Sequence, residues 1–150
     1  MKKILAILMI RSMMLCAVGC QNTQSAFAKA EIAAKYGIEE SVIDEWHSKF
    51  PKKTHLPPEY VDYEKDYVYV VLYPFAYDYD FAPDDFSEVS CKSVQIYEDD
   101  YIRFRSPAKT LALEMDISSR EVMEEVVNLL QQRADVYLAQ PKYLNNGFGW

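Results

Sequence analysis

The chain has little of what hydrolytic active sites require. It contains only two histidines, His47 and His55, and only four glycines, two of them among the last four residues. A serine-protease triad needs a histidine beside its nucleophile and an oxyanion hole of backbone donors. No glycine-rich serine motif occurs, and both histidines precede the expected core, His47 as an exposed helix residue and His55 as a loop residue. We therefore predict that this protein is not an enzyme.

Metal ligands are also scarce. Asp78, Asp80, Asp84 and Asp85 lie close together, but the run lacks the glycine and the closing glutamate of a calcium loop. The histidines show no paired ligand spacing. We interpret the acidic run as a solvated loop that leads into a helix start, and we expect neither a metal nor another cofactor.

Cysteine is too rare for a disulfide framework. Of the three cysteines, Cys16 and Cys20 fall in the apolar leader, which leaves Cys91 without an intrachain partner. Reactive thiols need an electropositive and accessible setting. We expect Cys91 to be a small, buried, unreactive residue.

Long apolar runs are absent except at the N-terminus. The chain begins with Met1 and two lysines, Lys2 and Lys3, and residues 4–10 are apolar. This pattern is typical of a secretory signal peptide. A lipobox-like run at residues 17–19 predicts cleavage before Cys20, which would then carry lipid; cleavage after Ala28 is the alternative. We favour the lipobox, with residues 1–19 as the signal peptide, and predict an exported lipoprotein anchored at the membrane or cell surface.

Basic residues are in the minority. The chain has 16 Lys and Arg against 23 Asp and Glu, and loss of the three basic residues in the leader would take the formal charge from −7 to −10. Nucleic-acid affinity depends on basic side chains that neutralise phosphates. A helix-turn-helix-like pattern at residues 31–46 carries acids where a recognition helix needs basic or amide groups. We therefore exclude nucleic acid as a partner.

What is present divides the chain into segments. Apolar residues with helical spacing, interrupted at Gly37, predict two short helices in an arm, and a group of prolines then separates this arm from the core. We expect a helical arm and linker at residues 20–65, an α+β domain at residues 66–143 and a C-terminal tail at residues 144–150.

Alternation of side chains predicts the first strands. The cleanest strand is residues 67–73, with aliphatic side chains on one face and mainly tyrosines on the other. Further strands are predicted at residues 91–97, 101–105 and 110–115. Residues 82–86 predict about one turn of helix, because Pro83 suits the first helical position and the acids Asp84 and Asp85 suit the first turn.

The clearest helix-strand unit spans residues 117–143. Ser118 and Glu121 form a capping box, so a helix should begin near Ser119. Its buried stripe is predicted to contain Val122, Met123, Val126, Val127, Leu129 and Leu130. A strand follows from Val136, and Pro141 is expected to end its pairing. The element order indicates an α+β protein with a ferredoxin-like antiparallel sheet, the split βαβ arrangement with a short first helix, and helices on one face.

The strand after this helix carries a family resemblance. The run Val136-x-x-Ala139-x-Pro141-x-Tyr143 resembles the ending of subtilisin-like serine protease propeptides, although Gln140 and Lys142 stand where that pattern usually has Glu and Asn. The resemblance implies the ferredoxin-like fold, a sheet that docks on the catalytic domain, and a tail that enters the substrate cleft. Because no catalytic domain follows, the chain is expected to bind, inhibit or help fold such a protease in trans.

Tyrosine is the most abundant aromatic residue and points to protein binding. Twelve tyrosines are present, and tyrosine is enriched at interfaces because it combines apolar area with a polar tip. The predicted partner-binding residues are Tyr67, Tyr69, Tyr73, Tyr137, Pro141, Tyr143, Leu144, Phe148 and Trp150. The alternative function is a cell-surface interaction module without a protease partner. In either case we expect a monomer.

Overall fold

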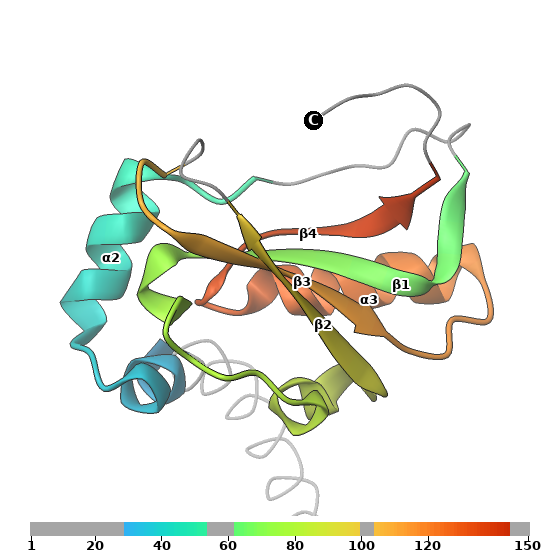
Figure 1. Cartoon of the computed structure of the whole chain (residues 1–150), viewed down its shortest axis with the longest axis horizontal. Helices are drawn as coiled ribbons and strands as arrows, with labels where there is room; N and C mark the ends of the chain where they lie inside the picture. Colours follow the sequence, from blue (N-terminus) through green and yellow to red (C-terminus); the bar gives the residue numbers. More distant parts are fainter. Residues whose placement is uncertain (1–28, 54–61, 100–103, 145–150) are drawn as a thin grey trace, which may run out of the picture.

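The computed structural model describes residues 29–53, 62–99 and 104–144. These residues form an α+β protein built on a four-stranded antiparallel sheet, as predicted (Figure 1). The helices are not confined to one face, because the arm packs against the face opposite α3 (Arg120–Gln132). The predicted signal peptide with Cys20, the linker histidine His55, and the tail residues Phe148 and Trp150 lie outside the described residues.

The four strands are β1 (Tyr63–Leu72), β2 (Ser93–Asp99), β3 (Ala108–Glu114) and β4 (Val136–Tyr143). Their order in the sheet is β2-β3-β1-β4, and each strand is antiparallel to its neighbours. The central strands are therefore β1 and β3, and the edge strands are β2 and β4.

The strand predicted at residues 101–105 is wrong where the structure describes it. Phe104 and Arg105 lie in a turn before β3, and Arg105 has a φ of 53°. That left-handed conformation does not fit an extended strand. Residues 101–103 are outside the described part of the chain.

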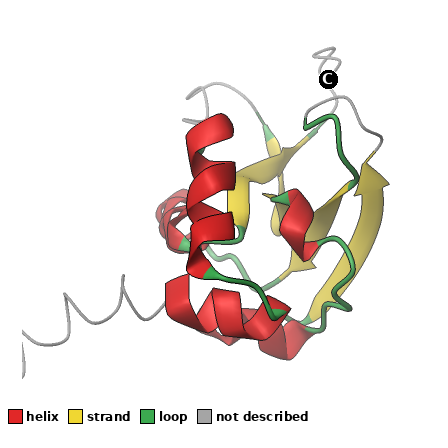
Figure 2. Cartoon of the chain, turned by 90° about the vertical axis from the view of Figure 1, so that its left-hand side faces the viewer, coloured by secondary structure: helices red, strands yellow, loops and turns green. Residues whose placement is uncertain are grey.

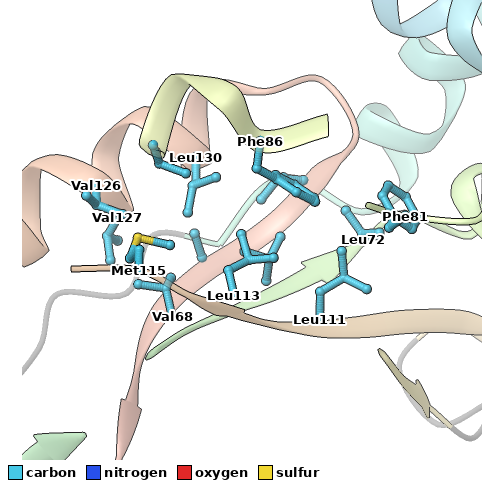
Figure 3. Close-up of a cluster of buried hydrophobic side chains, with 14 of the residues drawn as sticks. Val68, Leu72, Phe81, Phe86, Leu111, Leu113, Met115, Val126, Val127 and Leu130 are labelled. Carbon is cyan, nitrogen blue, oxygen red and sulfur yellow. The ribbon is translucent and has the colours of Figure 1, made fainter. Parts of the chain in front are cut away.

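One face of the sheet is covered by α3 (Arg120–Gln132). Figure 3 shows Val126, Val127 and Leu130 of this helix facing strand residues that include Val68 and Leu113. The predicted stripe is too wide, because Leu129 is 39% exposed while its neighbour Leu130 is fully buried. One position along the helix turns a side chain by about 100°, which carries Leu129 away from the sheet.

The start of this unit also differs from the prediction. The N-cap of α3 is Ser119, whose hydroxyl accepts a hydrogen bond from the Val122 backbone N–H at 3.3 Å, so the predicted cap at Ser118 is wrong by one residue. β4 continues past Pro141 to Tyr143, but its register with β1 shifts between the pair of Val68 with Pro141 and the pair of Tyr63 with Tyr143, so continuous pairing ends at Pro141 as predicted. An edge strand has one unpaired side and therefore tolerates a residue without an N–H.

Two 3₁₀ segments stand between β1 and β2, η1 (Pro74–Ala76) and η2 (Pro83–Val89). The second occupies the place of the predicted short helix. It buries Phe86 (Figure 3) and Val89 in the same core as α3. At its start, Asp85 accepts a hydrogen bond from the Ala82 backbone N–H at 2.8 Å.

The N-terminal arm is part of the core. Residues 29–36 are helical, Gly37 turns the chain with a φ of 63°, and α2 (Glu40–Lys49) follows. Ile32, Ala33 and Ile43 pack with Ala134, which lies just before β4. Figure 2 views the molecule from this end, with the helices beside the sheet. The arm therefore packs on the sheet domain.

Candidate protein-interaction surface

The sheet face opposite α3 is covered at one end only. Along β1 and the residue that follows it, the side chains that point to this face are Tyr67, Tyr69, Val71 and Tyr73; the first two are partly exposed and the last two are buried. Trp46 and Phe50 from the arm pack against Val71 and Tyr73. Because the arm covers Tyr73 and leaves Tyr67 and Tyr69 partly exposed, only the latter two are accessible to a partner protein.

The uncovered end carries a cluster that we call the open tyrosine face, made of Tyr67, Tyr69, Tyr97, Gln95 and Lys142. Tyr97 on β2 is 46% exposed, and its ring meets that of Tyr69 edge to face at 6.2 Å. The Tyr97 hydroxyl donates a hydrogen bond to Gln95 at 3.0 Å. Aromatic rings and amide groups thus lie side by side on one exposed surface.

Lys142 lies over this surface. Its ammonium is 4.8 Å from the centre of the Tyr67 ring and 6.0 Å from that of Tyr69, distances at which a cation is attracted to an aromatic face. It also pairs with Glu64 at 2.6 Å, and that hydrogen bond raises the pKa of Lys142. The lysine therefore remains charged at neutral pH and its charge is largely balanced by Glu64.

Several predicted partner-binding residues are not at the surface. Tyr73 is fully buried and Tyr137 is 5% exposed, and Pro141 is buried as well. The Tyr73 hydroxyl donates to the Phe50 carbonyl at 2.7 Å, and burial raises the pKa of Tyr73 to about 12. These side chains stabilise the fold, so a partner does not touch them.

The chain leaves β4 beside the open end. Tyr143 is partly buried, and burial raises its pKa to about 12. Leu144 is 47% exposed, and its backbone N–H donates to the Asp62 carbonyl at 3.1 Å. The structure thus brings Tyr67, Tyr69 and Leu144 to the surface among the predicted residues that it describes.

A buried polar junction fixes the arm to the turn before β4. Asp135 is fully buried and accepts hydrogen bonds from Arg133 at 3.0 Å and from the Tyr36 hydroxyl at 2.6 Å. Burial and the Asp135 carboxylate both raise the pKa of Tyr36. Burial opposes the charge of Arg133, but Asp135 and Glu88 outweigh it and raise the pKa of the guanidinium. Each charge here has a partner, which indicates a structural role.

A second ion pair ties the arm to η2. Lys35 pairs with Asp85 at 2.7 Å, and the Tyr79 hydroxyl donates to the same carboxylate at 3.0 Å. Burial alone would raise the pKa of Asp85, but these donors and the Ala82 N–H lower it. Asp85 is therefore a structural residue that joins the arm to η2. Within the described ranges, no group of acids, histidines and cysteines is placed to hold a metal ion.

Lys52 and His47 were missed as structural residues by sequence reasoning. The Lys52 ammonium donates to the Gln131 carbonyl at 2.8 Å and to that of Arg133, and burial lowers its pKa to about 8. His47 is half-buried and hydrogen-bonds the Ala134 carbonyl at 2.8 Å, so its prediction as an exposed residue is wrong. No local pattern reveals these contacts, because both bridge to the segment that ends α3 and precedes β4.

The setting of Cys91 disfavours a reactive thiol, although, contrary to the prediction, the residue is not fully buried. It is half-buried, its Sγ donates to the Ser93 carbonyl at 3.2 Å, and burial raises its pKa. A raised pKa reduces the fraction of thiolate, which is the nucleophilic form.

The fold and the surface define an α+β protein with one open aromatic sheet face. Comparisons with models of protein families, with curated proteins and with solved structures found no match. In the part of the chain that the structure describes, no helix has the length and apolar character needed to cross a membrane.

Proposed function

We propose that this protein is an exported, lipid-anchored module that binds a subtilisin-like serine protease in trans and inhibits it or assists its folding. It is a binding protein and not an enzyme. The observation that carries the proposal is the open tyrosine face with Leu144 at its border, where the chain leaves β4. Exposed tyrosines combine apolar contact area with hydrogen-bonding tips, which suits a protein interface.

The fold that we assign within this proposal is the ferredoxin-like arrangement. The order β2-β3-β1-β4 with antiparallel neighbours supports it, because this is the order that two interleaved βαβ units produce. In this assignment η2 takes the place of the first helix. The propeptide-like motif falls in β4, directly after the long helix.

The proposed docking has two parts. The open tyrosine face would rest on the catalytic domain, while the tail after Leu144 would enter the substrate cleft as an extended segment. Such a segment can pair with edge strands through main-chain hydrogen bonds and place side chains in specificity pockets. Phe148 and Trp150 are the aromatic residues available for those pockets.

Titration of subtilisin-like proteases with the chain lacking its predicted signal peptide tests this function. We expect inhibition at micromolar concentration, and a loss of about tenfold or more when the chain ends after Leu144. The double variant Tyr67→Ala/Tyr69→Ala should also weaken inhibition by about tenfold. The matched control is Leu129→Ala, an exposed residue of α3 that lies away from this face, and it should inhibit like the unchanged protein.

No inhibition at micromolar concentration, or equal inhibition by all four forms, would favour the second candidate. That candidate is a cell-surface interaction module without a protease partner. It is supported by a departure from the propeptide pattern, the short η2 in place of a full helix, and by an arm whose Trp46 and Phe50 pack against the sheet.

Anchoring is tested separately. A diacylated Cys20 should move the protein into the detergent phase of a partition experiment, since two acyl chains hold a protein at a membrane far better than one. Mass spectrometry that finds an unmodified N-terminus at Lys29 would instead support cleavage after Ala28.

A further inference from the structure

The two edge strands of the sheet differ in how many of their outward backbone groups are already hydrogen-bonded, and those of β4 are largely occupied. Gln131 of α3 donates from its side-chain amide to the Tyr137 carbonyl at 3.2 Å and accepts from the Ala139 N–H at 2.8 Å. The Lys53 backbone N–H also donates to the Tyr137 carbonyl at 3.1 Å. Pro141 contributes no N–H farther along. Backbone groups that an added strand would need on β4 are thus already used or missing.

The β2 edge is less protected: in the described part of the chain, a side chain reaches its backbone at its first residue, where the Cys91 Sγ donates to the Ser93 carbonyl at 3.2 Å. There β2 pairs with β3 alone, so its other side presents alternate backbone N–H and C=O groups outward. Ile96 is 43% exposed and Tyr97 is 46% exposed, one on each face of the strand. An edge with free backbone groups and exposed apolar side chains is a template for strand addition.

We propose that β2 binds an extended, basic segment of a partner protein as a fifth strand. β2 contains two acidic residues, Glu98 and Asp99, and no basic residue, and the whole chain has a formal charge of −7. Two copies of this strand would bring acidic edges together, which disfavours pairing of the chain with itself. A strand with lysine or arginine complements the edge in charge.

The two faces of β2 define which side chains the segment should carry. Ile96 pairs with Leu111 on the face that α3 covers, so an apolar residue of the added strand would lie beside it. Tyr97 lies on the opposite face and contacts Tyr69, so a cation there would meet aromatic rings. The expected ligand alternates apolar and basic residues.

The test uses a synthetic peptide of alternating lysine and valine, measured by fluorescence anisotropy with the chain lacking its predicted signal peptide. We expect saturable binding below about 1 mM, and none for the matched peptide with glutamate in place of lysine. Ile96→Lys should weaken binding by about tenfold or more, because it places a charge on the edge and repels the peptide. Leu129→Lys, with the same change at an exposed α3 position, should bind normally.

Hydrogen exchange locates the bound peptide. Backbone amides of β2 should gain protection on binding, while those of β4 should not. Absence of saturable binding, or equal weakening by Ile96→Lys and Leu129→Lys, would overturn the proposal. Concentration-dependent dimerisation of the chain alone that Ile96→Lys abolishes would also overturn it, since a second copy would then occupy the edge. No protease is present in these assays, so their failure is distinct from failure of the proposed function.

Discussion

The two ends of the sheet face opposite α3 have the same sequence pattern and different surroundings. Tyr67 and Tyr69 at one end are half-exposed, whereas Tyr73 at the other end is fully buried under Phe50 and Trp46. All three tyrosines alternate with aliphatic residues along one stretch of chain. Strand periodicity therefore assigns a side chain to a face of the sheet, but only tertiary contacts decide whether that part of the face is exposed to solvent.

The largest expected effect comes from the buried end. Tyr73→Ala should reduce the free energy of unfolding by about 3–5 kcal/mol, because it leaves a cavity and removes the hydrogen bond to Phe50. Tyr69→Ala at the open end should cost less than about 1 kcal/mol. Thermal or urea unfolding monitored by circular dichroism measures both, and equal losses would contradict the assignment of covered and open ends.

A somewhat smaller effect is expected at the junction that holds the arm in place. Asp135→Ala leaves Arg133 and Tyr36 without their shared carboxylate and should cost about 3 kcal/mol. The matched control is Asp116→Ala, which removes an ion pair with Lys92 whose acid is 84% exposed, and should cost less than about 1 kcal/mol. Chemical denaturation of both variants decides the point, and similar values would mean that the junction does not stabilise the covered end.

The smallest effect is a pH dependence at the same end. Burial, together with Lys52 and Lys29, lowers the pKa of His47 below 6.5, although the Ala134 carbonyl and Asp44 oppose the shift. The folded state then binds fewer protons than the unfolded state, so stability is complete above pH 6.5 and decreases as the pH falls below that value. In the variant His47→Gln, the midpoint of unfolding should depend less on pH between about pH 5 and 7 than it does in the unchanged protein. An unchanged pH profile in this variant would assign the dependence to another group.

Local patterns predicted the sheet because each strand and α3 carry their own signal. Val68, Val70 and Leu72 alternate on one face of β1, and the stripe of α3 repeats at helical spacing, so both could be assigned without knowledge of their neighbours. The cap of α3 was misplaced by one residue because Ser118 and Ser119 are adjacent and each can accept the same kind of bond.

The candidate surface was predicted only in part because its limits depend on distant contacts. Tyr36 meets Asp135 across 99 positions, and Lys52 meets the end of α3 across 79. Neither pair has a periodic signal in the sequence. Without those contacts the arm could not be placed on the sheet, and buried Tyr73 and Tyr137 could not be told from partly exposed Tyr67 and Tyr69.

The Tyr36 to Asp135 contact has a consequence for the speed of folding. It joins the first described helix to the turn before the last strand, and a loop of 99 positions must close before the contact contributes any free energy. Chains dominated by such distant contacts fold slowly. Since β4 also lies beside β1 in the sheet, the covered end cannot form until nearly the whole chain is available. A chain of this design therefore stays open, with its apolar arm accessible to chaperones or proteases, until its C-terminal strand is available to pair with β1.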